Sequence, residues 1–90
     1  MENGKIKSWS FQINDFDKLE LAITIEGAGW GVRASFHTLE NMEKLFNVLE
    51  IVDINQLTGS YCRVEFIDHN LLNTIYNIID DDKYYAVRNS

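Results

Sequence analysis

One cysteine and two histidines are the residues of this sequence whose types could support nucleophilic chemistry. Cys62 would be the nucleophile, with His37 or His69 as its general base. Cys62 falls on the inward face of a predicted strand, however, where a thiol stays protonated and packs as a small apolar side chain. The same residues cannot assemble a zinc site, which needs about four ligands at characteristic spacings. The sequence therefore predicts no catalytic residue, no metal site and no cofactor.

Carboxylates recur around two predicted turns, at Asp15, Asp17 and Glu20 and again at Asp80–Asp82. Paired carboxylates can perform acid–base chemistry when burial separates their pKa values. In a turn, water keeps such carboxylates ordinary, so solvated surface charge is the first interpretation of both groups. The alternative for Asp80, Asp81 and Asp82 is a weak cation site or a contact with a basic patch on a partner.

A glycine-rich segment, GAGWG, places Gly27, Gly29 and Gly31 around Trp30. Phosphate-binding loops need a strand before the glycines and a helix after them, whereas a strand follows here. Free backbone N–H groups could still hold a small anion. A tryptophan between glycines either folds back over the core or is displayed as an interface anchor. The sequence is compatible with both a core-packing and a displayed Trp30.

Hydrophobic alternation predicts three strands before residue 38. The first covers 5–14, with Trp9, Phe11 and Ile13 on one face. A turn at 15–18 leads to the second, which carries Leu19, Leu21, Ile23 and Ile25 on one face. The third covers 32–37, with Val32, Ala34 and Phe36 inward and Arg33, Ser35 and His37 outward.

One helix and further strands complete the predicted fold. Thr38 is a suitable N-cap, and an apolar stripe at helical spacing follows it, made of Leu39, Met42, Leu45, Phe46 and Leu49. A helical turn over 53–59, a strand over 60–67 and a turn at 68–70 come next. Residues 71–79 fit either a helix or a strand, and the preceding turn favours a strand; residues 83–87 can add a short one. The sequence thus predicts an α+β domain spanning 1–90, with an antiparallel, curled sheet (βββαββ along the chain) packed on one helix.

Composition narrows the classes of partner. Of the 90 residues, 14 are acidic and 8 basic, which gives a net charge of −6. This argues against binding nucleic acid through its phosphates and permits a protein partner with a basic surface, although acidity also serves solubility. A single cysteine and the lack of a long apolar stretch predict a cytoplasmic protein without a signal peptide or membrane segment. An edge strand could support homo-oligomers.

Residues 20–85 resemble a family of short proteins carried by phages and prophages of low-GC bacteria. The resemblance rests on the order of a strand, a G-x-G-x-G loop, a helix and two motifs. The motifs are L-x-G-x-x-C-R-V (Leu57, Gly59, Cys62, Arg63, Val64) and D-K-aromatic-aromatic (Asp82, Lys83, Tyr84, Tyr85). The chain departs from the family pattern at Trp30 and at Tyr84. The resemblance implies a mobile-element setting and a strand over 72–79; it supplies no site.

Two functional hypotheses follow. The first is a non-enzymatic phage or prophage protein that binds and inhibits a host protein, for example a defence factor such as a CRISPR nuclease complex. Its contact residues would be Trp30, Arg33, Ser35, His37, Asp80, Asp81 and Asp82. The alternative is a protein that binds or sequesters a nucleotide signal through Gly27, Gly29, Trp30 and Gly31. An enzyme is the least favoured hypothesis.

Overall fold

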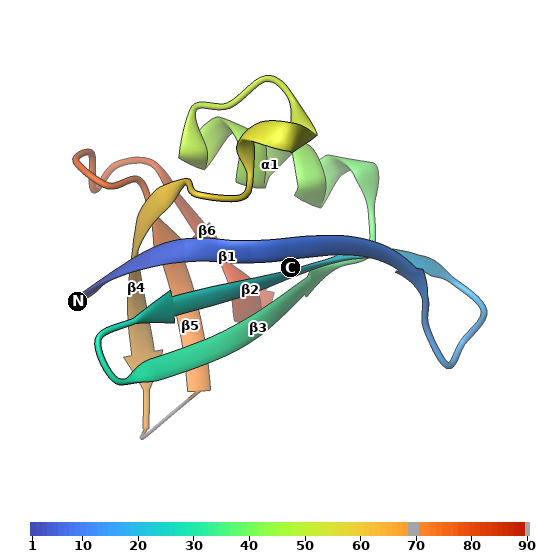
Figure 1. The fold of residues 1–90 in the computed structure, drawn as a ribbon, viewed down its shortest axis with the longest axis horizontal. Coiled ribbons are helices and arrows are strands. Elements are labelled where there is room, and N and C mark those ends of the chain that lie inside the picture. The colour runs from blue at the N-terminus through green and yellow to red at the C-terminus, as the bar shows by residue number, and fades with distance from the viewer. Residues whose placement is uncertain (69–70, 90) are drawn as a thin grey trace.

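The computed structural model describes residues 1–68 and 71–89, and its strands and helices follow the order predicted from the sequence (Figure 1). The elements are β1 (Glu2–Ile13), β2 (Leu19–Gly27), β3 (Trp30–Phe36), α1 (Leu39–Leu49), the 3-10 helix η1 (Ile54–Gln56), β4 (Tyr61–Ile67), β5 (Leu71–Tyr76), β6 (Tyr84–Ala86) and the 3-10 helix η2 (Val87–Asn89). Most of the turn predicted over 68–70, including His69, lies outside the described residues.

The six strands form one antiparallel sheet in the order β3-β2-β1-β4-β5-β6, which confirms the predicted α+β fold. The sheet consists of two meanders, β1-β2-β3 and β4-β5-β6. β1 joins them, because its first residues pair with β4 and the rest of the strand pairs with β2. The chain crosses from one meander to the other through α1, which lies over one face of the sheet (Figure 1).

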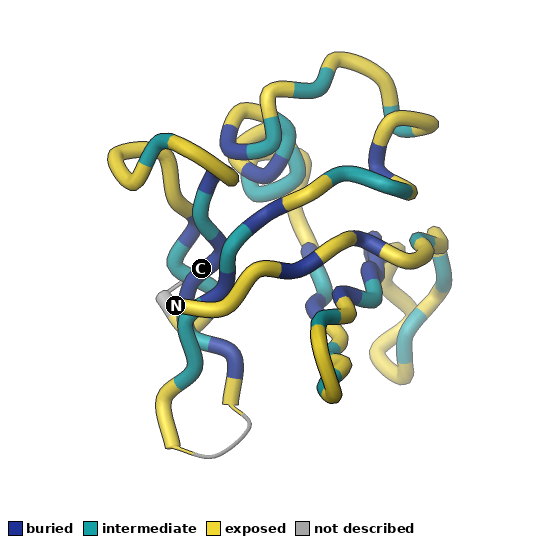
Figure 2. The backbone as a smooth tube through the Cα atoms, turned by 60° about the vertical axis from the view of Figure 1, so that its left-hand side comes forward, coloured by how far each residue is buried: buried dark blue, intermediate teal, exposed yellow. Residues whose placement is uncertain are grey.

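The sheet curls so that the edge strand β3 approaches the second meander across the core. The rings of Phe36 in β3 and Tyr85 in β6 have centroids 5.1 Å apart, and those of Trp30 and Phe66 are 5.2 Å apart. More and less buried positions alternate along β3, whereas β2 is buried continuously from Glu20 to Ile23, and exposed residues gather at the turns (Figure 2). The enclosed core thus lies between the two meanders.

β1 is longer than predicted and contains an irregularity. Its pairing with β2 shifts register between Ile6 and Ser8, so Ile6 and Trp9 both face the core although three positions separate them. Trp9, Phe11 and Ile13 share a face, as predicted. The β1–β2 hairpin extends beyond the core, however, and leaves Phe11 and Ile13 exposed.

α1 begins and ends as its sequence indicates. The Thr38 hydroxyl accepts a hydrogen bond from the Asn41 N–H at 3.1 Å, and the helix stops at Glu50, whose φ of 58° is left-handed. Leu45 and Val48 are buried in the core. Leu39, expected in the buried stripe, is 77% exposed because it opens the helix beside the projecting hairpin. Among the described residues, no helix has the length and apolar character required to cross a bilayer.

β5 resolves the ambiguity of the segment 71–79 in favour of a strand, but the strand ends at Tyr76. Asn77 ends it. The Asn77 amide is buried, donates to the Val48 carbonyl at 2.7 Å, and accepts the N–H groups of Ile79 and Asp80, each at 3.0 Å. This side chain ties the β5–β6 loop to the end of α1. The expectation that 77–79 continue the strand is therefore wrong.

Trp30 folds back over the core instead of being displayed. Its indole lies across two glycines: a Cβ on Gly27 would come within 2.2 Å of Trp30 Cε2, and one on Gly4 within 2.9 Å of Cη2. Gly29 adopts a φ of +80° in the two-residue turn between β2 and β3, a conformation that favours glycine. Gly31 has room for a Cβ, and nothing in the structure explains a glycine there. Most of the glycine-rich segment thus serves the turn and the indole.

This packing predicts different effects on stability when each of two nearby glycines is replaced by alanine. Gly27→Ala forces the indole away from the core, and overpacking of this kind costs about 1–3 kcal/mol of unfolding free energy. Gly31→Ala meets its nearest atom at 3.8 Å and should change stability by less than about 0.5 kcal/mol. Urea denaturation followed by tryptophan fluorescence measures both. Equal destabilisation by the two variants would contradict the placement of Trp30.

Candidate binding surface at one end of the sheet

The outer face of the first meander carries three cross-strand rows of polar and small side chains. Ser8, Thr24 and Arg33 form one row; Ser10, Ala22 and Ser35 form the next; Gln12, Glu20 and His37 form the last. In the last row, a hydrogen bond and an ion pair join side chains from all three chain segments. Gln12 Nε2 donates to Glu20 Oε1 at 2.8 Å, and His37 Nδ1 lies 3.3 Å from Glu20 Oε2.

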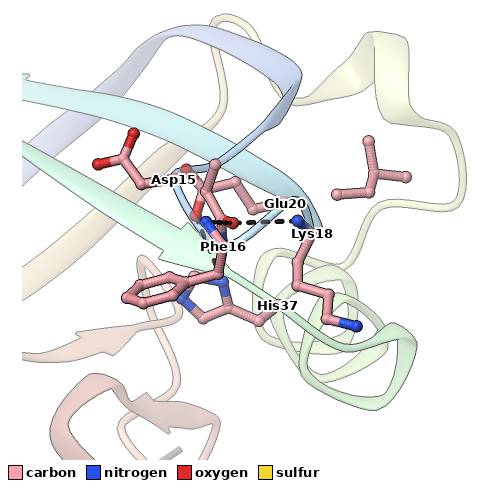
Figure 3. Close-up of a pocket in the computed structure, with 7 residues that line it drawn as sticks. Asp15, Phe16, Lys18, Glu20 and His37 are labelled. Carbon is pink, nitrogen blue, oxygen red and sulfur yellow. Dashed lines mark hydrogen bonds and ion pairs between the residues drawn. The ribbon is translucent and has the colours of Figure 1, made fainter.

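The turn between β1 and β2 is held by one side chain. Asn14 Oδ1 accepts the backbone N–H groups of Phe16 at 2.9 Å and Lys18 at 3.1 Å (Figure 3). Backbone hydrogen bonds from Asn14 to Lys18 and from Asp17 to Asn14 close the turn. Asparagine suits this position because its side chain can replace backbone partners in a turn. The turn therefore presents Phe16, which is 82% exposed, in a defined position.

A hollow lies beside this turn and above the last polar row. It is lined by Asn14, Asp15, Phe16, Lys18, Leu19, Glu20 and His37 and has a volume of about 730 Å³. Glu20 and His37 form an ion pair within its lining, to which Phe16 also belongs (Figure 3). Most of the lining is supplied by the hairpin, while His37 comes from the end of β3. This places one predicted contact residue, His37, inside a concave site.

The inner face of the same hairpin end is apolar. Phe11 lines a second hollow together with Leu39, Met42, Glu43 and Phe46 of α1. Ile13 and Leu19 are paired across β1 and β2 next to Phe11, and both are exposed. We call the four exposed apolar residues at this end of the molecule the hairpin–helix surface; they are Phe11, Ile13, Leu19 and Leu39.

The residues predicted to contact a partner do not form one surface. Arg33 and Ser35 lie on the outer face of β3, and His37 continues this row directly after the strand, as the alternation predicts. Trp30 begins the same strand but packs against Phe66 on the core side. Asp80–Asp82 belong to the β5–β6 loop, beside the end of α1. Of the predicted contact residues, His37 alone lines the hollow beside the hairpin turn.

The loop that carries Asp80–Asp82 forms contacts within the protein. Asp81 forms an ion pair with Arg63, which also donates two hydrogen bonds to the Asn77 carbonyl, at 3.1 and 2.9 Å. Asp80 Oδ1 accepts the Asp82 N–H at 2.9 Å. Lys83, next in sequence, forms an ion pair with Glu50, and this hydrogen bond raises the pKa of Lys83. These contacts give the loop a structural role.

The candidate nucleophile and its candidate bases do not come together in the described residues. Cys62 is fully buried in the core, and burial raises the pKa of its thiol to about 11. His37 lies on the outer face of the sheet, against Glu20, and His69 lies outside the described residues. In residues 1–68 and 71–89, no group of three or more His, Cys, Asp or Glu side chains is arranged to hold a metal ion.

The interpretation of Glu20 as solvated turn charge is wrong, because its side chain is only 10% exposed. Sequence reasoning also did not single out Phe16 or the hairpin–helix surface as a site. The alternation of β2 already placed Glu20 opposite the core-facing leucines, but it gave no sign that the carboxylate would be buried. A search for polar residues at facing positions of the predicted hairpin could have found the pair of Gln12 and Glu20. The exposure of Leu39 carries no such signal, because its spacing fits the buried stripe of α1.

Comparison with protein-family models, curated protein sequences and solved structures gives no significant match for this chain.

The raised pKa of Cys62 predicts a pH dependence of stability. The unfolded chain ionises this thiol from its ordinary value of 9.0, whereas the folded chain keeps it protonated up to about 11. The thiol's contribution is fully present below about pH 9 and is lost as pH rises toward 11, in total about 3 kcal/mol. Urea titrations between pH 8 and about pH 11 should show a steeper loss of unfolding free energy for the wild type than for Cys62→Ala. Parallel curves of unfolding free energy against pH for the two proteins would contradict the burial of the Cys62 thiol.

Proposed function

We propose that this protein is a non-enzymatic binding protein that recognises and inhibits another protein. The observation that carries the proposal is the hairpin–helix surface, where the exposed Phe11 and Leu39 line one hollow and the exposed pair of Ile13 and Leu19 lies next to Phe11 in the sheet. Water-exposed apolar side chains that are contiguous in this way are typical of protein-interaction sites. Displayed aromatic and aliphatic anchors next to a pocket are also the usual centre of binding energy.

The shape of this end of the molecule suits recognition. The hairpin projects beyond the core, and its turn is held by Asn14 through hydrogen bonds instead of by burial. A partner could therefore contact its apolar inner face and its polar outer face at the same time. Since the turn is already ordered, binding would cost little conformational entropy at Phe16.

Charge indicates the chemistry of the partner. Glu43 lines the apolar hollow, and Asp15 and Asp17 flank Phe16 in the hairpin turn. In a protein with a net charge of −6, such a rim attracts a basic surface and speeds its association. We therefore assign the occupant as a protein segment whose apolar side chains are flanked by Lys or Arg.

The biological setting comes from the resemblance to phage and prophage proteins alone. On that basis the partner would be a protein of a bacterial host, met in the cytoplasm, and a defence factor such as a CRISPR nuclease complex is the first to test. The glycine-rich turn gives no support to the alternative of a nucleotide ligand, because its geometry is explained by the turn and by Trp30.

The proposal predicts that Leu39→Gln weakens capture of the partner at least about tenfold, because burial of one leucine contributes about 1.5–3 kcal/mol. Glutamine leaves the net charge unchanged and is a good helix former, so α1 should remain folded. The measurement is affinity capture from a bacterial lysate with quantitative mass spectrometry, followed by titration of the purified partner and an assay of the partner's activity.

Two matched controls are available, Val52→Gln and Ile79→Gln. Both residues are apolar and as exposed as Leu39 or more, at 92% and 86%, but lie away from the hairpin–helix surface. They should retain the partner and inhibit its activity as the wild type does. The proposed function would be contradicted if all three variants behaved alike, or if the wild type retained no protein.

A further inference from the structure

Glu20 is an unusual residue for the outer face of a sheet, because its side chain is only 10% exposed. Burying a carboxylate is costly unless hydrogen bonds and opposite charge compensate it. Gln12 supplies a neutral donor, and His37 supplies a full opposite charge only when it is protonated. The site therefore holds a negative charge that its neighbours compensate in part.

The hollow above Glu20 combines a carboxylate with aromatic and aliphatic side chains. An ionised carboxylate has about four acceptor positions; Gln12 donates to one oxygen of Glu20, and His37 lies 3.3 Å from the other, so acceptor positions remain. Phe16 presents an exposed ring at one side, and Leu19 adds apolar surface at another. A carboxylate floor with an aromatic wall and an aliphatic wall is suited to a cation carried on an apolar stem.

We propose that this hollow binds a guanidinium group, supplied by an arginine side chain of the protein partner. The guanidinium would donate to the Glu20 carboxylate and lie against the Phe16 ring, while the methylene stem contacts Leu19. The assignment to a partner rests on the proposed function, since the hollow adjoins the hairpin–helix surface at Leu19, which belongs to both.

Geometry favours guanidinium over ammonium. A guanidinium is planar, can donate in parallel to a carboxylate and stacks on an aromatic ring, whereas an ammonium is a strongly hydrated point charge. The charged rim does not oppose this, because Lys18 and Asp15 carry opposite charges. The Lys18 side chain also extends away from Glu20 (Figure 3).

The binding step can be tested without the partner. Uniformly ¹⁵N-labelled protein is titrated with N-acetyl-arginine amide, and amide shifts are followed by NMR. N-acetyl-citrulline amide is the neutral analogue of nearly the same shape, and N-acetyl-lysine amide carries the charge without the planar group. We expect saturable shifts at residues 14–20 and 37 with the arginine probe. The dissociation constant should be about tenfold higher with lysine and higher still with citrulline.

Two variants locate the binding. Glu20→Gln should raise the dissociation constant for the arginine probe at least about tenfold. Glu26→Gln makes the same change on the same strand and should have no effect. Phe16→Ala, at an exposed position whose loss should not affect folding, should raise the constant about threefold. It keeps the test decisive if Glu20→Gln fails to fold. Absence of saturation, equal binding of citrulline, or shifts unaffected by these variants would overturn the proposed site.

Failure of this inference is distinguishable from failure of the proposed function. If capture of the partner is lost in Leu39→Gln but unchanged in Glu20→Gln, the protein-binding proposal stands and the arginine contact is overturned. Loss in both variants supports both proposals. If the arginine probe binds at Glu20 but the wild type retains no protein, the assignment to a partner is overturned, and a free guanidinium compound becomes the ligand.

Discussion

The arrangement of the whole molecule depends on the divided pairing of β1. Residues 2–5 pair with β4 and residues 5–13 pair with β2, so this strand alone joins the two meanders of the sheet. The register shift after Ile6 lets β1 keep apolar side chains toward the core on both sides of the irregularity. A bulge also increases local twist and bends the strand. The curl of the sheet, the meeting of β3 with β6, and the space filled by Leu45 and Val48 of α1 all follow from this geometry.

The same division leaves the far half of β1 with only one strand partner. Beyond the core, the β1–β2 hairpin must be held by its own contacts, and the structure supplies them in the Asn14 turn and in the row of Gln12, Glu20 and His37. The hairpin consequently presents two different faces at one end of the molecule. Apolar side chains, including Phe11, face α1, and a buried carboxylate faces the outer hollow. At the opposite end of the molecule, the Trp30 indole packs over Gly4 and Gly27, and Asn77 holds the β5–β6 loop.

Local sequence predicts much of the fold and little of the site. Period-two alternation and the Thr38 cap are enough for β2, β3 and α1, because burial and local hydrogen bonds decide these elements. The register shift in β1 depends on two partner strands distant in sequence, and Asn77 depends on the Val48 carbonyl. The environment of Glu20 is likewise made by residues of neighbouring strands, so a linear pattern indicates only that this side chain points outward. The outward orientation of Arg33, Ser35 and His37 is predicted correctly. The positions of Trp30 and of Asp80–Asp82 depend on tertiary packing, which a local pattern does not show.

The central claim is that the projecting hairpin end is the recognition surface, and site-specific photo-crosslinking in living cells tests it most directly. A benzophenone amino acid at position 16, where the native ring is 82% exposed, is a conservative replacement. The same group at positions 52 and 79 serves as the reference. The account predicts one dominant adduct from position 16, formed with the protein whose activity is inhibited, and none from the two reference positions. Adducts of similar yield from all three positions, or from positions 52 and 79 only, would contradict it.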